Sequence, residues 1–238
     1  MTETVRRSPW GTAVLVLLLV GLAAWLVGNS ALFAARDIRV LGNVRLTSHD
    51  AQRLAGVSKG DNLLRLDTEG SVRSLERSPW VAGASVGRSF PSTLVIRIEE
   101  RTAAAWLRDG EGPVLLAADG TVLERLRERP ADVPFVGRWG TALTRGQRID
   151  APAVLRVAAT LPTELVPRIR SVTVEDGQLQ LSVGGGAMVR YGEATALEAK
   201  HRALASVLDW ARERRVAVAT IDLRIPHTPA LEPLPSRG

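Results

Sequence analysis

Side chains that could bind a metal or perform catalysis are few in this chain of 238 residues. The sequence contains no Cys, which excludes thiolate catalysis, disulfides and cysteine-based metal sites. Its three histidines are His49, His201 and His227, and no two of them are four residues apart, the spacing that places two imidazoles on one helix face. The sequence therefore predicts no metal site, and we expect no cofactor.

Two patterns that resemble catalytic motifs have simpler explanations. The glycine run 184–186 is not followed by the Lys-Ser or Lys-Thr of a phosphate-binding loop, so we interpret it as a turn between strands. Glu99 and Glu100 are neighbours on a predicted strand and point to opposite faces, which prevents them from sharing one substrate. We predict that the chain is not an enzyme.

The residues best placed to recognise a partner lie near the end of the chain. Apolar and polar residues alternate over 219–225, which predicts a strand with one buried and one open face. Pro226 ends this strand, and the Pro-rich segment after it is expected not to pair, so the strand should form a sheet edge that can receive a partner strand. The candidate residues on it are Asp222, Leu223, Arg224 and Ile225. The alternative is that Asp222 and Arg224 simply solvate an uninvolved edge.

Two cations on a predicted helix are further candidates. Lys200 and Arg202 lie in a segment whose apolar residues recur at helical spacing. They could contact acidic groups of a partner, whereas the charged face of an amphipathic helix in water is the simpler interpretation. We keep both as candidate partner-binding residues.

The positive charge does not predict nucleic-acid binding. The net charge is +6, but the arginines are spread among acidic residues, and Lys59 and Lys200 are the only lysines. Aromatic residues make up 4% of the chain, whereas a nucleic-acid surface clusters basic residues with aromatics. We expect no nucleic-acid partner, and only a minor attraction to anionic lipid head groups near a membrane anchor.

A long uncharged segment near the N-terminus predicts that anchor. Residues 8–35 contain no Asp, Glu, Lys, Arg or His, and Trp10 and Trp25 flank an apolar centre. A bilayer core of roughly 30 Å needs about 20 helical residues. We therefore predict a cytoplasmic stub over residues 1–10 and a single transmembrane helix over 11–33, which contacts membrane lipid.

The domains beyond this anchor are expected to be extracytoplasmic, because a long domain after an early span is translocated largely regardless of its charge. A cleaved signal peptide is the alternative. Its cleavage site would need small residues after a shorter apolar core, and Ala31 and the pair Ala34–Ala35 are only loose candidates.

Residues 36–102 predict a small α+β domain. Its expected elements are a strand at 38–40, a helix that Thr47 caps and Gly56 ends, a helix capped by Asp67 or Thr68 and ended by Ser78-Pro79, and strands at 84–88 and 94–99. This order is typical of two helices packed on one face of a small sheet.

Residues 103–226 predict a second, β-rich domain with a long helix near its C-terminal end. Asp119-Gly120 and Asp176-Gly177, each between apolar runs, predict two hairpins. Asp150 is expected to cap a short helix. Segment 227–238 is expected to be a disordered tail. The predicted fold class is therefore α+β, with one N-terminal transmembrane helix before these two domains.

Several motifs in these domains resemble the FtsQ/DivIB family of bacterial cell-division proteins. Residues 36–102 are similar to the POTRA domain of that family, and the motifs concerned are Ile38-x-Val40-x-Gly42-Asn43, Gly60-x-Asn62-Leu63-Leu64-x-Leu66-Asp67, Pro79-Trp80-Val81-x-x-Ala84-x-Val86-x-Arg88-x-Phe90-Pro91-x-Thr93-Leu94 and Ile98-x-Glu100-Arg101. The landmarks that resemble its β domain are Asp119-Gly120-Thr121-Val122, Tyr191-Gly192, Lys200 and Ile221-Asp222-Leu223-Arg224.

This resemblance implies a non-enzymatic divisome scaffold, enriched at the division septum, that helps link assembly of the division ring to septal peptidoglycan synthesis. The implied partners are FtsB/DivIC-like and FtsL-like division proteins and the septal peptidoglycan synthesis machinery. By the same resemblance, the last strand receives a strand from the FtsB/DivIC-like partner, and Arg224 pairs with a partner carboxylate. The alternative function is a membrane-anchored envelope enzyme or receptor acting on peptidoglycan. A third possibility is a POTRA chaperone of outer-membrane barrel assembly, but such a protein would carry several POTRA copies, which this sequence does not show.

Overall fold

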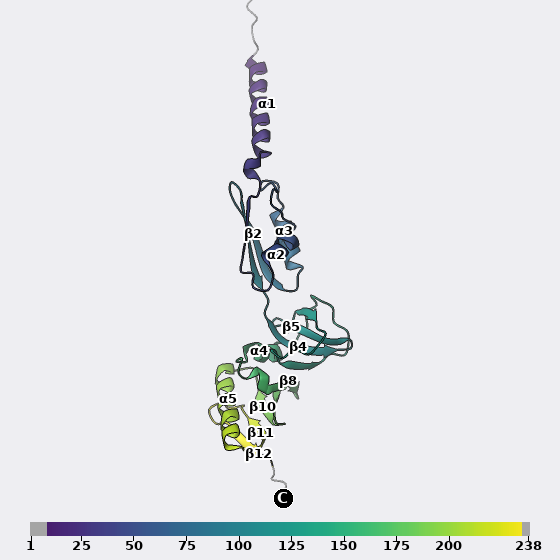
Figure 1. The fold of residues 1–238 in the computed structure, drawn as a ribbon, viewed down its shortest axis with the longest axis vertical. Helices are drawn as coiled ribbons and strands as arrows, with labels where there is room; N and C mark the ends of the chain where they lie inside the picture. The colour runs from purple at the N-terminus through teal and green to yellow at the C-terminus, as the bar shows by residue number, and fades with distance from the viewer. Residues whose placement is uncertain (1–8, 235–238) are drawn as a thin grey trace, which may run out of the picture. The chain divides into compact units, whose positions relative to one another are not determined.

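The computed structural model describes residues 9–234, which form two compact units divided between Glu100 and Arg101 (Figure 1). Each unit has its own hydrophobic core. Residues 1–8 and 235–238, which hold most of the predicted stub and the end of the predicted tail, lie outside the described residues.

The N-terminal unit begins with helix α1, Pro9–Gly28, followed by the short 3-10 helix η1, Ala31–Phe33. The helix predicted over 11–33 therefore ends five residues early. Gly28 is a poor helix former, and the side chains of Asn29 and Ser30 bond back to the carbonyls of Trp25 and Val27, at 2.8 and 2.6 Å. Within residues 9–234, no helix is both long enough and apolar enough to cross a bilayer.

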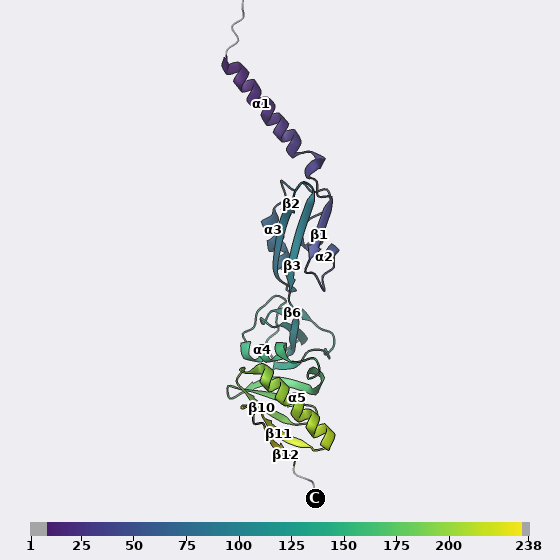
Figure 2. The same ribbon diagram turned by 90° about the vertical axis from the view of Figure 1, so that its left-hand side faces the viewer.

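The rest of this unit is a three-stranded sheet covered by two helices. Its elements are β1 (Asp37–Leu41), α2 (Ser48–Ala55), α3 (Thr68–Glu76), β2 (Val81–Ser89) and β3 (Thr93–Glu100). The strand order is β1-β3-β2, with β1 parallel and β2 antiparallel to β3. Figures 1 and 2 show α2 and α3 on the same face of this sheet, where their apolar residues bury against those of β1 and β3. The predicted order of elements is confirmed.

Local capping explains where both helices begin. The Thr47 hydroxyl accepts the Asp50 N–H at 3.1 Å, and the Asp67 carboxylate accepts the Gly70 N–H at 2.8 Å. Helix α2 ends at Gly56, which adopts a left-handed conformation with φ of 66°. These three boundaries follow the sequence prediction.

The C-terminal unit contains two sheets. The first has the order β6-β5-β4-β7 and consists of β4 (Ala103–Asp109), β5 (Gly112–Ala117), β6 (Val122–Arg125) and β7 (Phe135–Arg138). The second has the order β12-β11-β10-β9-β8 and consists of β8 (Ile169–Glu175), β9 (Gln178–Val183), β10 (Met188–Gly192), β11 (Val218–Asp222) and β12 (Ala230–Pro233). Both predicted hairpins, β5–β6 and β8–β9, are present.

Two helices cover these sheets. Helix α4 (Pro152–Thr160) buries Val154 and Val157 in the core of the second sheet and Leu155 and Ala158 in the core of the first. Its N-cap is Ala151, which corrects the predicted cap at Asp150. Helix α5 (Leu197–Arg214) lies across one face of the second sheet (Figure 2), and the turn η2 (Val166–Arg168) precedes β8.

Strand β12 overturns the prediction for the end of the chain. Residues 230–233, expected to be part of a disordered tail, pair antiparallel with β11. β11 is therefore an interior strand between β10 and β12, and β12 is the edge of the sheet. The prolines next to the strand and at its end do not prevent pairing, because Pro229 precedes the strand and Pro233 is its last residue.

Candidate partner-binding site

The free edge of β12 is the strongest candidate for a binding site in the C-terminal unit. Among the described residues, β12 pairs with β11 on one side and with no strand on the other. The Leu234 N–H donates to the Ala217 carbonyl at 2.9 Å, so it points toward β11. The backbone N–H and carbonyl groups of successive residues in a strand point in alternate directions. Those of Glu232 therefore also point toward β11, and those of Leu231 point toward the open side. An unpaired N–H and carbonyl of this kind can pair with an incoming strand.

The side chains along this edge divide between the core and solvent. Leu231 packs against the hydrophobic core, whereas Ala230, Glu232 and Pro233 are exposed. The Leu231 side chain thus fixes β12 to the sheet without using the outward N–H of the same residue. The edge is short and carries one charge and one proline, features that limit nonspecific strand pairing.

Asp222 and Arg224, two of the predicted residues, pair with each other beside this edge. The Arg224 guanidinium donates to both Asp222 carboxylate oxygens, the shortest contact being 2.6 Å, and the Arg224 N–H donates to the same carboxylate at 3.0 Å. The hydrogen bond from Arg224 is the main reason that the pKa of Asp222 lies below its usual range. The Arg224 side chain remains largely exposed, so its charge is accessible to a partner.

Gly192 makes room for this arginine. It has a φ of 76°, a conformation that favours glycine, and a Cβ added to it would lie 3.0 Å from Arg224 Cγ. The glycine of the Tyr191-Gly192 pair that the sequence resemblance singles out thus has a structural explanation.

Leu223 and Ile225 have opposite environments. Leu223 is fully buried, and its N–H donates to the Arg190 carbonyl at 2.9 Å, so it continues the pairing of β11 with β10. Ile225 is 65% exposed, which makes it the apolar side chain of this segment that a partner could cover. The predicted site therefore retains Arg224 and Ile225 at its surface, whereas Leu223 belongs to the core.

Lys200 is not at the surface, which corrects its prediction as a partner contact. It is 2% exposed, and its ammonium donates to the carbonyls of Tyr191 and Glu193, both at 2.8 Å. Burial is the main cause of the lowered pKa of Lys200. This lysine joins α5 to the end of β10. Arg202, one half-turn further along α5, is exposed and forms no ion pair within the described part of the chain.

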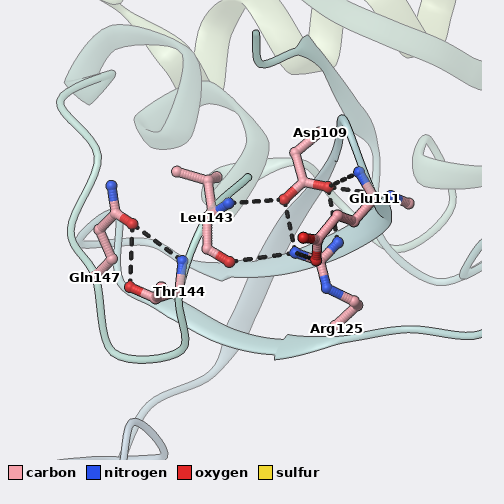
Figure 3. Close-up of polar contacts among 7 residues, drawn as sticks. Asp109, Glu111, Arg125, Leu143, Thr144 and Gln147 are labelled. Atoms are coloured by element: carbon pink, nitrogen blue, oxygen red, sulfur yellow. Dashed lines mark hydrogen bonds and ion pairs between the residues drawn. The ribbon is translucent and has the colours of Figure 1, made fainter. Parts of the chain in front are cut away.

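The C-terminal unit also contains a buried ion pair that the sequence did not indicate (Figure 3). The Asp109 carboxylate accepts two hydrogen bonds from the Arg125 guanidinium, at 2.7 and 2.8 Å. It also accepts the backbone N–H groups of Glu111, Gly112 and Leu143, at 2.9 to 3.0 Å. The Arg125 hydrogen bond is the largest cause of a pKa of Asp109 far below its usual range. With all of its oxygens engaged, this carboxylate fastens the β4–β5 turn to β6 and to the loop at residue 143.

Other side chains that could act in catalysis are also buried or engaged in structural hydrogen bonds. The Glu100 carboxylate accepts the N–H groups of Val44, Arg45 and Leu46, at 2.8 to 3.0 Å, so it holds the loop at residues 44–46 against the end of β3. His201 is buried, and burial lowers its pKa. Within residues 9–234, no cluster of three His, Asp or Glu side chains could hold a metal ion.

One spacing typical of hydrolases is present but lacks its structural context. Residues 56–60 read Gly-Val-Ser-Lys-Gly, a pattern that in those enzymes joins a strand to a helix. Here the segment follows helix α2, and the Ser58 N–H donates to the Asp61 carboxylate at 2.7 Å. Within the described residues, no hydrogen bond joins the Ser58 hydroxyl to a histidine.

The two units together define a class of protein in which a small βααββ domain precedes a β-rich domain with an open strand edge. Residues 33–101 match the family model for the POTRA domain of FtsQ type, and residues 104–224 match the model for the C-terminal domain of cell division protein FtsQ/DivIB. The chain therefore belongs to the FtsQ/DivIB family of cell-division proteins. The second match ends at Arg224, so β12 lies beyond it.

Curated relatives agree with this assignment. Cell division protein FtsQ of Streptomyces collinus is 28% identical over 228 residues, which cover 92% of this chain and 85% of that protein. Cell division protein FtsQ of Anaeromyxobacter sp. (strain K) is 40% identical over 117 residues, 48% of this chain and 40% of that protein. A solved structure, the major extracytoplasmic domain of the trans isomer of DivIB from Geobacillus stearothermophilus, matches 38% of this chain and 76% of its own, with 18% identity and a TM-score of 0.30.

Proposed function

We propose that this chain is a non-enzymatic scaffold of the division machinery, which binds other division membrane proteins and helps link assembly of the division ring to septal peptidoglycan synthesis. Membership of the FtsQ/DivIB family supports a role in division. The observation that carries the scaffold proposal is the open edge of β12, with its outward Leu231 backbone groups, the exposed Ile225 and the accessible Arg224 guanidinium.

The proposed partner is an FtsB/DivIC-like division protein, together with an FtsL-like protein. In strand addition, backbone hydrogen bonds supply affinity and alternate side chains supply specificity. A partner strand beside β12 would use the N–H and carbonyl of Leu231, and an acidic partner residue would reach Arg224, whose guanidinium faces solvent on one side. An apolar partner residue would cover Ile225.

Two substitutions at Leu231 separate the backbone contact from the side-chain contact. Both Leu231→Pro and Leu231→Ala remove the leucine side chain that packs on the core, but only proline removes the outward N–H. We expect Leu231→Pro to lower the amount of FtsB/DivIC-like protein that co-purifies with the full chain by at least about tenfold, and Leu231→Ala to retain most of it. Arg156→Glu, at an exposed position of helix α4 outside the proposed site, serves as the surface-charge control.

The same two Leu231 variants should differ in their ability to support cell division. Leu231→Ala should restore septum formation in cells depleted of this protein, and Leu231→Pro should leave them undivided while elongation continues. Equal co-purification with both variants, at similar melting temperatures, would remove the role that we assign to β12.

We propose further that the chain is held in the cell membrane by its N-terminal segment, with its folded units outside the cytoplasm and enriched at the division septum. The support is the uncharged run 8–35 and the exposure of every apolar side chain from Val14 to Val20 by more than half, a surface that water does not favour. Reporter fusions after Gly42 and after Gly238 should both give extracytoplasmic signals in growing cells. A cytoplasmic signal from either fusion contradicts this topology.

A further inference from the structure

Three loops of the N-terminal unit converge on the end of helix α1. The Gly28 carbonyl accepts the Asn62 side-chain amide at 2.7 Å, and the Phe33 carbonyl accepts the Leu63 N–H at 2.8 Å. The third loop joins them through the Arg36 N–H, which donates to the Ser92 carbonyl at 2.8 Å. These contacts place segments 29–36, 58–66 and 89–92 side by side.

The surface that these loops form, which we name the three-loop surface, combines exposed apolar side chains with cations. Leu32, Leu64 and Phe90 are between 47% and 55% exposed. The cations are Arg36, Lys59 and Arg65, all exposed. Among the described residues, none of these three forms an ion pair, and so their charges are available to an external ligand.

The acidic groups at this end of the unit are already engaged. Asp61 accepts the Ser58 N–H at 2.7 Å, Asp37 pairs with Arg39 at 2.7 Å, and Asp67 caps helix α3. The Ser58 N–H is neutral, so Asp61 keeps its charge. The three-loop surface therefore presents three cations against this one carboxylate, beside apolar side chains.

We propose that the three-loop surface binds the surface of a bilayer that contains anionic phospholipid. Arginine and lysine are attracted to anionic head groups, while leucine and phenylalanine side chains enter the interfacial region beneath them. The surface is also continuous with α1, since four residues separate Gly28 from Phe33. This inference rests on the proposed attachment of the N-terminal segment to the membrane, but it concerns the folded domain rather than the helix.

The absence of cysteine from the chain permits a direct test with one label in the full-length protein. Phe90→Cys places an environment-sensitive fluorophore, NBD, on the three-loop surface. Val44→Cys places it at the opposite end of the same sheet, where the Val44 N–H donates to Glu100, the last residue of β3. The protein is added to vesicles of phosphatidylcholine alone, or of phosphatidylcholine with phosphatidylglycerol, each with and without a lipid that carries a nitroxide on its head group.

We expect the label at position 90 to shift its emission to the blue and to be quenched by the nitroxide in vesicles that contain phosphatidylglycerol, and the label at position 44 to do neither. Lys59→Glu with Arg65→Glu should reduce the quenching at position 90 on the order of twofold or more. Arg97→Glu, an exposed arginine elsewhere on β3, should leave it unchanged.

Sedimentation with the vesicles distinguishes the two proposals. If the chain sediments with both vesicle types while the label at position 90 stays water-exposed, the attachment holds and the lipid contact of the domain is wrong. A label that is shielded without nitroxide quenching overturns the lipid contact in favour of a protein contact. A chain that sediments with neither vesicle type overturns both proposals.

Discussion

Asp109→Asn is expected to lower the free energy of unfolding of the C-terminal unit by about 3 kcal/mol at neutral pH. The substitution leaves the Arg125 guanidinium without its carboxylate and weakens the acceptor for three backbone N–H groups. Breaking one side of a buried ion pair costs roughly 3–5 kcal/mol, and the low end applies because Arg125 is partly exposed. For a unit of this size, the melting temperature should fall by roughly 10 °C, measured by calorimetry of the full chain.

The pH dependence of this effect has a definite sign. Its hydrogen bond with Arg125 holds the pKa of Asp109 below the usual value, so the ionised carboxylate favours the folded state. Its stabilisation is therefore complete above the unfolded pKa of about 3.9 and is lost as the pH falls through the folded pKa. The stability difference between the native protein and Asp109→Asn should be constant near neutral pH and shrink below about pH 4.

Asp209→Asn provides the matched control for this prediction. It also removes the acidic partner of an arginine, since Asp209 and Arg168 lie 2.6 Å apart, but that pair is at the surface. We expect a loss of at most about 1 kcal/mol and no change in the acid limb of the stability profile. Equal losses from Asp109→Asn and Asp209→Asn would show that the five hydrogen bonds to Asp109 do not stabilise the unit as we infer.

Lys200→Met is expected to lower the free energy of unfolding of the C-terminal unit by about 2 kcal/mol. Methionine retains most of the aliphatic stem but cannot donate, so the carbonyls of Tyr191 and Glu193 lose their partner. Methionine also removes the free-energy cost of burying a charge. The expected loss is therefore smaller than the stabilisation that two hydrogen bonds from a charged donor would give. Chemical unfolding followed by circular dichroism measures it.

Arg202→Met is the control on the same helix. Arg202 is exposed and unpaired within the described residues, so its replacement should change stability by no more than about 0.5 kcal/mol. The expected effect of Lys200→Met on partner binding is one that the sequence does not suggest. Lys200→Met should reduce co-purification of the partner only to the extent that it unfolds the unit. Loss of the partner from a variant that is as stable as the native protein would show that Lys200 contacts the partner.

Short-range features of this protein are determined by the sequence itself. The caps at Thr47 and Asp67 and the left-handed end of α2 at Gly56 each involve residues within four positions of one another. The Asp222–Arg224 pair is of the same kind, because alternate residues of a strand share a face. These interactions depend on local geometry, so spacing and residue type were sufficient to predict the helices, the hairpins and the polar face of the penultimate strand.

Contacts between distant segments were decided only by the tertiary structure. Asp109 and Arg125 meet because β5 places the β4–β5 turn beside β6, and no spacing in the sequence indicates that contact. Lys200 looks like a surface cation on a helical pattern, but the end of β10 turns two carbonyls toward it and holds it in the core. The sheet edge, which the sequence predicts at β11, is formed by β12 for the same reason. The prolines near the end of the chain predicted that no strand would form there. Pairing with β11 and burial of Leu231 nevertheless stabilise β12, and its last residue, Pro233, is at a position where a missing backbone N–H is tolerated.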